Sequence, residues 1–241
     1  MGLAGYGSRV EGLHAVSAAA AAGRVETLYV EEGRRHRAVI RELVDSVGES
    51  RVRLVDDVRA LAETTAPQGV VADCRPIVAV TLDSLAGPGA AVMVLDHIED
   101  PHNLGAVARS VRAAGLTGMV VSGRRAAPLS AAAFKAAAGA LERLPVSVVG
   151  SIPEALRRLK KSGLWVVGLQ ADAGENLFGL ELLTEPVAVV VGAEGSGLSR
   201  LVAERCDVLV SIPMVKGSES LNASVTAALA AFEIMRVRTP G

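Results

Sequence analysis

Short apolar runs that alternate with helical patterns constrain the fold of this chain more than any other feature of its sequence. In the carboxyl-terminal part the runs cover residues 91–96, 118–122, 146–149, 164–169, 187–192 and 207–212, and the helical patterns cover 103–114, 130–142, 152–162, 197–204 and 220–236. Strands that are buried on both faces are continuously apolar, and intervening helices form the crossovers of a parallel sheet. We therefore predict an α/β domain whose parallel sheet is covered by helices on both faces.

A smaller α/β pattern occupies the amino-terminal part. It predicts helices over 10–22, 37–47 and 56–65 and strands over 25–32, 52–55 and 68–74. The later stretch "DSLAGPGA" has the glycine and proline content that is typical of a linker. We divide the chain into a first domain at 1–75, a linker at 76–89 and a second domain at 90–241.

The composition limits the cellular setting. Half of the 241 residues are hydrophobic, but no apolar stretch reaches the roughly 18 residues of a membrane span. The start lacks the basic-then-apolar pattern of a signal peptide. Cys74 and Cys206 share no metal-type spacing, and free thiols suit a reducing compartment. We expect a soluble, cytoplasmic protein without a membrane partner.

The net charge of −1 gives no global sign of nucleic-acid binding, so any RNA contact must use local patches. The strongest candidate is the cluster Arg34, Arg35, Arg37 and Arg41, which follows an apolar strand. The alternatives are Arg124 with Arg125, and the run "RRLKK" at 157–161, which we favour as a solvated helix face.

Polar residues follow three of the predicted strands, where ligands of parallel sheets bind. The first segment, "LDHIEDPHNLGAVARSVRAAG", contains acidic and histidine side chains on an irregular loop without a fixed ligand geometry, so we expect no metal. Asn103 stands at a predicted helix start and can act as a plain N-cap. Arg109 lies in an alanine- and valine-rich helix, where an arginine must reach a carboxylate, a phosphate or the solvent.

The second segment, "VAVVVGAEGSGLSR", has glycines that match neither the dinucleotide fingerprint nor the P-loop. Its backbone can approach a ligand closely, with Glu194 as the charged side chain, although a purely structural turn is the alternative. The third segment, "IPMVKGSESLNASV", predicts a helix start near Ser220. The free N–H groups there, together with Ser220 and Asn222, can bind a substrate or cofactor.

Taken together, the three segments resemble the three motifs of the SpoU (TrmH-type) RNA ribose methyltransferases. The matching residues are Asn103, Gly105, Ala106 and Arg109, then Gly192, Glu194 and Gly197, and finally 212–214 with 220–222. The amino-terminal stretches "YGSRVEGLHAV" and "PQGVVA" are similar to the small ribosomal-protein-like substrate-binding domain of the branch that methylates guanosine in large-subunit ribosomal RNA.

This resemblance implies a SPOUT-type sheet with a carboxyl-terminal trefoil knot and a homodimer whose active site lies near the subunit contact. S-adenosylmethionine would be held by the backbone at Gly192, Ile212 and Leu221. The chain departs from the family in one place, because Lys216 stands where a glycine is common and the glycine follows at Gly217.

The reaction implied is methyl transfer to a ribose 2′-hydroxyl of RNA, with a guanosine of 23S ribosomal RNA as the expected substrate. Since free arginine is protonated at all ordinary pH values, Arg109 is expected to stabilise the developing alkoxide or hold the neighbouring phosphate. Asn103 would orient the ribose or Arg109, and Glu194 would hold Arg109 or the RNA. Ser220 and Asn222 would contact the hydroxyl or the cofactor.

Three alternatives remain open. The same reaction on transfer RNA or at another ribosomal site, including that of a resistance methylase, needs the same residues. A non-catalytic RNA-binding assembly factor with this fold need not keep Asn103, Arg109, Glu194 and Asn222. An ordinary nucleotide-binding α/β enzyme lacks its glycine fingerprint here.

Overall fold

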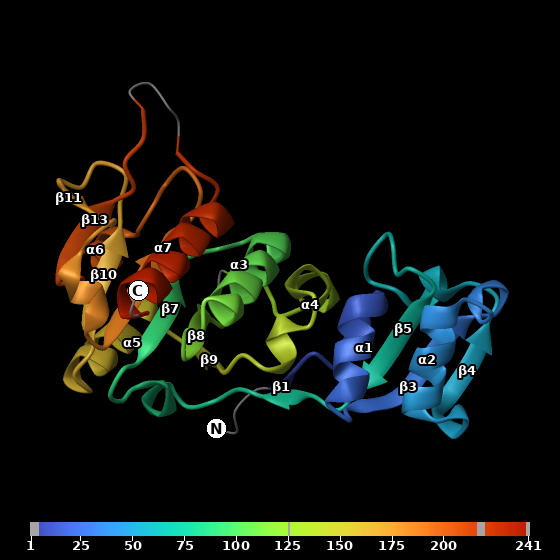
Figure 1. Cartoon of the computed structure of the whole chain (residues 1–241). Helices are drawn as coiled ribbons and strands as arrows, with labels where there is room; N and C mark the ends of the chain where they lie inside the picture. Colours follow the sequence, from blue (N-terminus) through green and yellow to red (C-terminus); the bar gives the residue numbers. More distant parts are fainter. Residues whose placement is uncertain (1–4, 125, 216–219, 240–241) are drawn as a thin grey trace.

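The computed structural model describes residues 5–124, 126–215 and 220–239. The chain forms two parts, each built on its own sheet, that lie side by side along one long axis (Figure 1). The amino-terminal part has a four-stranded sheet in the order β2-β5-β3-β4, and the carboxyl-terminal part has a seven-stranded sheet in the order β11-β13-β10-β12-β7-β8-β9. None of the described helices is both long and apolar enough to cross a membrane.

All pairs in the seven-stranded sheet are parallel, as predicted. In the central pair, Val190 of one strand lies beside Val94 of the next. The strands are β7 (Ala91–Leu95), β8 (Gly118–Ser122), β9 (Val146–Val149), β10 (Trp165–Leu169), β11 (Glu175–Asn176), β12 (Val187–Val191) and β13 (Val208–Ser211). The short edge strand β11 was not predicted, since two residues leave no periodic pattern.

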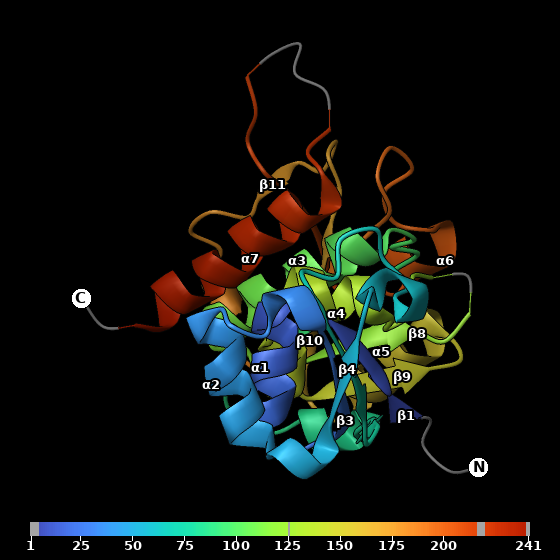
Figure 2. The ribbon, with the colours of Figure 1, turned by 90° about the vertical axis from the view of Figure 1, so that its right-hand side faces the viewer.

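Helices cover both faces of this sheet, because successive strand side chains point to opposite sides. Met93 and Val189 pack in one apolar cluster with α3 (Pro101–Ala113), α4 (Ala131–Ala137) and α7 (Ala223–Arg238). Val92 and Val190 pack in a second cluster with α5 (Ile152–Lys161) and α6 (Arg200–Ala203). Figure 2 shows the molecule from the side of the amino-terminal part, with α7 running across one face.

The amino-terminal part has a mixed sheet, in which only β3 and β4 are parallel. Its elements are β2 (Arg9–Glu11), α1 (Leu13–Ala21), β3 (Val25–Glu31), η1 (Glu32–Arg34), α2 (Ala38–Val47), η2 (Glu49–Arg51), β4 (Val52–Val55), η3 (Val58–Leu61) and β5 (Val70–Cys74). The helices α1 and α2 pack against each other and bury Val16, Ile40 and Leu43.

Three predicted helices differ from those observed. The first begins at Leu13 because residues 9–11 form β2 and Gly12 turns the chain with φ 83°. The expected helix at 56–65 is only the short 3₁₀ turn η3, which Asp57 caps. The helix at 130–142 breaks at Ala138 and Gly139, both with positive φ, into α4 and η5 (Ala140–Glu142).

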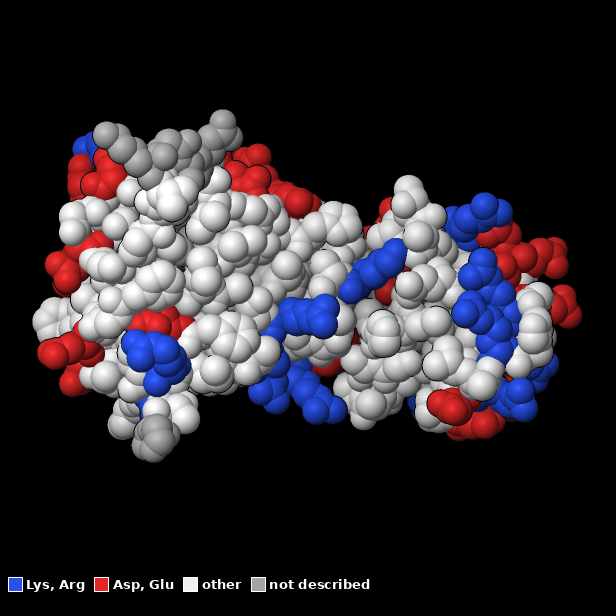
Figure 3. Space-filling view, turned by 45° about the horizontal axis from the view of Figure 1, so that its top comes forward, with Lys and Arg blue, Asp and Glu red and all other residues white. Residues whose placement is uncertain are grey.

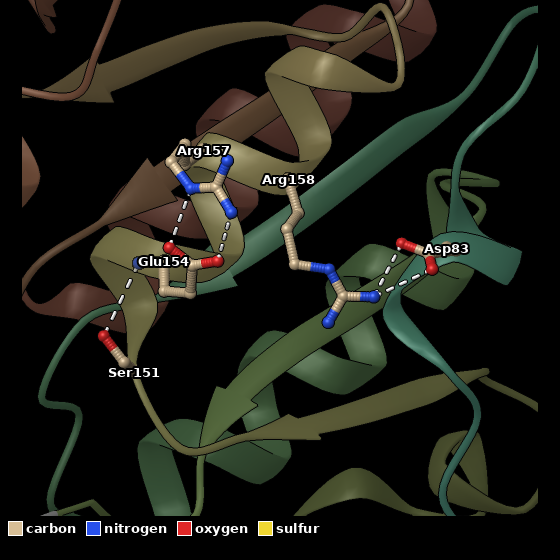
Figure 4. A network of polar contacts seen from close by, with 5 residues as sticks. All are labelled: Asp83, Ser151, Glu154, Arg157 and Arg158. Carbon is tan, nitrogen blue, oxygen red and sulfur yellow. Dashed lines mark hydrogen bonds and ion pairs between the residues drawn. The ribbon is translucent and has the colours of Figure 1, made fainter.

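The segment expected as a linker is largely packed. β6 (Ile77–Val78) pairs antiparallel with β1 (Gly5–Tyr6), so two strands run side by side between the two parts. The turn η4 (Leu82–Leu85) buries both of its leucines. Asp83 in this turn accepts two hydrogen bonds from Arg158 of α5 at 2.8 Å (Figure 4).

Candidate active site

The loops that follow β7, β12 and β13 meet at one edge of the large sheet. β7 and β12 are neighbours, whereas β13 lies beyond β10. Asn103 comes from the first loop region, Glu194 from the second and Asn222 from the third. The prediction that these three segments converge is correct, although their strands are not all adjacent.

Glu194 is the centre of the contact. Its Oε1 accepts hydrogen bonds from Asn103 Nδ2 at 3.1 Å, from the Ala223 N–H at 3.3 Å and from Asn222 Nδ2. Asn222 Nδ2 also donates to Asn103 Oδ1 at 3.1 Å. A carboxylate that accepts several N–H bonds at a helix start is held in a fixed position beside the positive helix end.

Asn222 links this network to α7. It is the N-cap of the helix, and its Oδ1 accepts from the N–H groups of Ser224 at 2.8 Å and Val225 at 3.4 Å. The helix therefore begins at Ala223, later than the predicted start near Ser220. Ser220 and Leu221 precede it in a segment without regular secondary structure.

The glycines of the second segment shape a tight turn that carries Glu194. Ala193 and Gly197 exchange two main-chain hydrogen bonds, at 3.1 and 2.9 Å. Gly195 and Gly197 have φ of 76° and 64°, and a Cβ on Gly192 would lie 2.1 Å from the Gly197 carbonyl oxygen. These glycines are therefore needed by the turn itself, which was the structural alternative in the sequence analysis. The same turn also places Glu194 at the site.

A pocket opens beside this turn. The three residues predicted to hold a cofactor, Gly192, Ile212 and Leu221, all line it, together with Ser220. The rest of its wall is mostly apolar or main chain and includes Leu169, Gln170, Val191, Ala193, Val210, Met214 and Thr226. The space between its walls is about 660 Å³ when the part that is open to solvent is included.

A second hollow adjoins the first and shares part of its wall. Ala193, Glu194 and Ala223 line both spaces. Asn103 and His97 line only the second. The two hollows therefore adjoin where the turn that carries Glu194 meets the start of α7.

Asp96 is a buried acidic residue that the sequence reasoning assigned no role. It is fully buried at the end of β7, where its Oδ2 accepts from the Ser199 N–H at 2.8 Å and its Oδ1 contacts His97 Nδ1 at 2.6 Å. Ser199 follows the glycine turn, so Asp96 ties the first segment to the second. The only feature of the sequence that could have indicated this role is an aspartate that directly follows a continuous apolar strand.

One predicted role in the first segment needs correction. Asn103 is not the N-cap of α3, because Asp100 takes that place and accepts from the His102 N–H at 2.9 Å. Gly105 allows close packing, since a Cβ there would lie 2.4 Å from the Ala133 carbonyl oxygen of α4. The departure at Lys216 and Gly217 lies outside the described residues.

Arg109 stands apart from the network. It is exposed on α3, and none of the hydrogen bonds and ion pairs among the described residues involves it. It lies six residues beyond Asn103, about 9 Å farther along the helix axis. Among the described residues, the Glu194 side chain bonds Asn103 and Asn222, while its expected contact with Arg109 or the RNA stays a prediction.

Comparisons with known proteins identify the chain. The SpoU rRNA Methylase family matches residues 90–232, and a domain described as RNA 2′-O ribose methyltransferase substrate binding matches residues 9–77. The chain belongs to the SpoU rRNA methylase family. It is thus an S-adenosylmethionine-dependent RNA 2′-O-ribose methyltransferase, as the motifs predicted.

Relatives match this SpoU protein over nearly its whole length. It is 37% identical to the 23S rRNA (guanosine-2′-O-)-methyltransferase RlmB of Pseudomonas aeruginosa, with 96% of this chain and 97% of the relative covered. It is 36% identical to RlmB of Ralstonia nicotianae over 95% of each chain. The crystal structure of the SpoU methyltransferase AviRb from Streptomyces viridochromogenes with AdoMet has a TM-score of 0.80, at 29% identity, and covers 95% of this chain and 89% of that one.

The pocket of this SpoU protein fits S-adenosylmethionine chemically. Leu169, Ile212 and Leu221 offer apolar surface for a purine ring, and the main chain of the glycine turn offers hydrogen-bonding groups to the polar part. Among the described residues, no group of three or more His, Cys, Asp or Glu side chains could hold a metal ion.

The predicted RNA-binding arginines are partly paired with carboxylates. Arg34 Nε lies 2.9 Å from Glu31, Arg35 Nη2 lies 2.8 Å from Glu49, and Arg41 donates to the His36 carbonyl oxygen at 3.1 Å. Figure 3 shows basic and acidic side chains interleaved over the amino-terminal part. This surface is therefore less positive than the run of arginines in the sequence suggests.

The run "RRLKK" is mostly engaged in ion pairs. Arg157 bonds Glu154 one turn earlier in α5, and Arg158 bonds Asp83 (Figure 4). Lys160 lies 2.6 Å from Asp207. These contacts support the interpretation of this run as a solvated helix face that also secures neighbouring loops.

Proposed function

We propose that this SpoU methyltransferase modifies one ribose of 23S ribosomal RNA, namely the 2′-hydroxyl of a guanosine. The observation that carries the proposal is the hydrogen-bonded contact of Asn103, Glu194 and Asn222, in which Glu194 lines both hollows and Asn103 lines the second. The near full-length similarity to RlmB proteins, which are named for this reaction, and the match of a substrate-binding domain to residues 9–77 support the choice of substrate.

The pocket beside the glycine turn would take the cofactor, held by the main chain at Gly192, Ile212 and Leu221. When bound there, S-adenosylmethionine supplies an electrophilic methyl group. Ser220 lines this pocket and would hydrogen-bond to its ligand. Asn222 caps α7 and would thereby hold the start of this helix in place beside the pocket.

The second hollow would take the target ribose. Asn103 and Glu194 line it and can orient a hydroxyl by hydrogen bonds, one as a donor and the other as an acceptor. Alignment of the hydroxyl with the methyl group is the main requirement, because correct positioning of two reactants removes much of the barrier. The fixed Glu194 carboxylate provides this alignment from the wall common to both hollows.

Arg109 would act on the RNA from a neighbouring subunit. Arg109 does not line the second hollow of its own chain, and its exposure leaves it available to a partner. In a homodimer, the guanidinium of one subunit would stabilise the developing alkoxide, or hold the adjacent phosphate, at the site of the other.

The homodimer itself is part of the proposal. α7 exposes an apolar stripe at helical spacing, formed by Val225, Phe232 and Met235, and α7 packs directly beside α3, which carries Arg109. Phe178 is also exposed, one residue from Gly179, whose N–H bonds Glu233 of α7 at 2.8 Å. Exposed apolar side chains that gather on one helix face favour contact with a second subunit.

Mixed dimers test this arrangement. Arg109→Ala and Glu194→Gln chains are each expected to be inactive as homodimers, while a mixture should regain activity because one site of each mixed dimer keeps both side chains. If Arg109 acts in its own chain, both sites of the mixed dimer lack one side chain and the mixture stays inactive.

We further propose the division of labour between domains. Residues 1–75 would bind RNA, 76–89 would connect the domains, and 90–241 would carry the chemistry and the trefoil knot of the SPOUT class. For the knot, the supporting feature is the path of α7, which leaves β13 and returns across the sheet to η6 (Glu181–Thr184), where Arg238 donates to Leu183 at 2.8 Å.

Transfer of a labelled methyl group tests the substrate proposal directly. Purified protein, labelled S-adenosylmethionine and protein-free RNA should give label in 23S ribosomal RNA, recovered as 2′-O-methylguanosine. Label in transfer RNA instead would overturn the choice of RNA, and cofactor binding without any transfer would favour the non-catalytic alternative.

A further inference from the structure

One buried ion pair joins the two parts of the molecule. Arg24 precedes β3 in the amino-terminal part, and Glu142 belongs to η5 in the carboxyl-terminal part. Arg24 Nε donates to Glu142 Oε2 at 2.7 Å and Nη2 donates to Oε1 at 2.5 Å, which makes the pair bidentate. Arg24 is 9% exposed and the Glu142 side chain is 1% exposed, so both charges are withdrawn from water.

The same guanidinium also holds both strands that run between the domains. Arg24 Nη1 donates to the Gly7 carbonyl oxygen at 3.1 Å, just after β1, and to the Arg75 carbonyl oxygen, just before β6. One side chain therefore fixes the incoming strand, the outgoing strand and the methyltransferase domain. Among the ion pairs of the described residues, no other joins an arginine or lysine of the amino-terminal sheet to a carboxylate beyond residue 90.

Aromatic and small residues close the surface around this pair. Arg24 Cζ lies 5.9 Å from the centre of the Phe134 ring, and the Tyr6 and Phe134 ring centres are 6.1 Å apart. Gly7 has φ 71°, and a Cβ there would lie 2.3 Å from Phe134 Cζ. The helices α1 and α4, which face each other across the junction in Figure 1, can approach closely because a Cβ on Gly139 would lie 2.7 Å from Ala18 Cβ.

The electrostatics agree with this geometry. Burial disfavours the charge of Arg24, but hydrogen bonding and attraction to Glu142 outweigh that effect and raise the pKa of Arg24 above its ordinary value. Burial, together with repulsion from Glu142, raises the pKa of the neighbouring Tyr6 to about 12. Arg24 is thus charged at all working pH values, and deprotonation of this arginine cannot release the contact.

We propose that Arg24 and Glu142 are positioning residues that lock the RNA-binding domain onto the methyltransferase domain in a single orientation. This inference rests on the proposed function for its biological meaning. Interfaces between domains of one chain ordinarily allow relative motion. A buried, geometrically demanding ion pair adds little net stability but selects one arrangement over others, since any other arrangement leaves a charge uncompensated.

The consequence for the reaction is a fixed distance between the RNA-binding surface and the second hollow of each subunit. RNA held by the amino-terminal domain would then present one ribose to Asn103 and Glu194. Figure 3 shows lysine and arginine side chains on both sides of the junction, over which such an RNA could pass. A misplacement of about 1 Å at a reacting centre can cost roughly a hundredfold in rate.

Distance measurement between spin labels tests the lock without any RNA. Labels are placed at Ser50→Cys in the amino-terminal domain and Lys161→Cys in the other, both exposed, with Cys206 replaced by alanine and the buried Cys74 retained. Labelled chains are mixed with an excess of unlabelled chains, so that in the proposed homodimer the measured distances lie within one subunit. We then expect one narrow distance distribution for the otherwise unchanged protein. A broad distribution there would overturn the proposal.

Two substitutions and their combination make the test specific. Glu142→Gln and Arg24→Met each leave one buried charge uncompensated and should broaden the distribution. The double variant carries neither charge and should be narrower than either single variant, which is the signature of a coupled pair. The matched control is Glu154→Gln with Arg157→Met, an exposed pair of the same kind that should change nothing (Figure 4). An unchanged distribution in both single variants would contradict the proposal.

Activity provides the second measurement. Glu142→Gln should lower kcat/KM for ribosomal RNA by up to about a hundredfold, while S-adenosylmethionine binds with unchanged affinity, because the pocket lies at the far edge of the sheet. Unchanged kcat/KM in a variant with a broadened distribution would refute the positioning role. If the unchanged protein methylates no RNA, the proposed function fails, whereas the distance distributions still decide whether the lock exists.

Discussion

The two domains arrange their polar residues in opposite ways. In the methyltransferase domain, Asn103 and Asn222 are 119 positions apart, yet they contact each other and share Glu194. In the amino-terminal domain, four arginines lie within eight positions, and two of them pair with carboxylates 3 and 14 residues away. The denser polar network is therefore formed by residues that are distant in sequence, not by those that are close.

The difference follows from topology. Parallel strands bring their carboxyl ends to one edge, so residues that follow separate strands converge. A run of arginines on a turn and the helix after it spreads over a surface, where each side chain finds its own local partner. We therefore expect a site with defined chemistry where the strand ends converge. Where arginines follow one another in sequence, we expect a surface to which each side chain adds a small electrostatic contribution.

The largest effect should come from Glu194→Gln. A glutamine can keep one oxygen for the Asn103 and Asn222 amides but removes the charge, so the fold should persist while methyl transfer falls about a hundredfold or more. Transfer assays with saturating RNA and calorimetry of cofactor binding measure the two properties. Glu181→Gln, an exposed residue, is the control. Full activity of Glu194→Gln would remove this residue from the mechanism.

Asp96→Ala should have the next largest effect, on stability. It leaves the half-buried Ser199 N–H without its acceptor, and the loss of a hydrogen bond to a charged group typically costs about 1–3 kcal/mol. Urea unfolding measures the decrease in the free energy of unfolding, with the exposed Asp172→Ala as control. Equal stability of the two variants would mean that Asp96 does not hold the first and second motifs together.

The arginine surface should give a smaller and graded effect. Removal of a single phosphate contact lowers the slope of log affinity against log salt by about 0.7 to 0.9. Replacing Arg34, Arg35, Arg37 and Arg41 by alanine should weaken RNA binding and flatten the slope, with unchanged cofactor binding. Because Arg34 and Arg35 are paired with Glu31 and Glu49, the double variant at Arg37 and Arg41 should account for most of this change.

The control for this surface is Arg157 and Arg158→Ala, where both cations are already engaged. If this control flattens the salt slope as much as the quadruple variant does, the RNA runs over α5, and the amino-terminal arginines are only a solvated turn.

The smallest effect on stability at neutral pH is expected from the two cysteine thiols, one in each domain, because their ionisation matters only at higher pH. Burial is the main cause that raises the pKa of both Cys74 and Cys206 to about 12. Since an unfolded thiol has a pKa of about 8.5, the folded state holds these protons to higher pH, and its stability should be fully present below about pH 8.5 and decline from there toward pH 12.

A thiol reagent at pH 8 should therefore react with each cysteine about a thousandfold or more slowly in the folded protein than in the unfolded chain. Mass spectrometry can assign the modified residue. Unequal rates would show which domain opens more readily, and rapid reaction of both would contradict their burial.

Much of this was predictable from sequence, for reasons that particular residues make clear. The strands 118–122 and 146–149 were placed correctly because short, valine-rich, mostly apolar runs between turns have few alternatives. The convergence of Asn103, Glu194 and Asn222 followed from strand-end geometry together with the family motifs. The roles of Gly192 and Gly105 in close packing depend on what lies opposite them, which no local pattern records.

Other features depend on long-range contacts that the sequence does not encode locally. Arg24 and Glu142 have no distinguishing pattern, although together they join the domains. Many polar residues follow a strand, and nothing in the local sequence distinguishes Asp96 from them. Its role depends on its hydrogen-bond partner Ser199, which is 103 positions away. Arg109 was grouped with Glu194 by motif, but in the described part of the chain Glu194 bonds Asn103 and Asn222 instead.

Mapping of ribose methylation in cells tests the central claim, that residues from three distant segments form one methyl-transfer site acting on 23S ribosomal RNA. The modification is mapped at nucleotide resolution in cells without the gene, and in the same cells supplied with the unchanged gene or with Glu194→Gln. We predict that one guanosine of 23S ribosomal RNA loses its 2′-O-methyl group without the gene, regains it with the unchanged gene and does not regain it with Glu194→Gln. Unchanged methylation of 23S ribosomal RNA in all three strains, or full restoration by Glu194→Gln, would contradict the account.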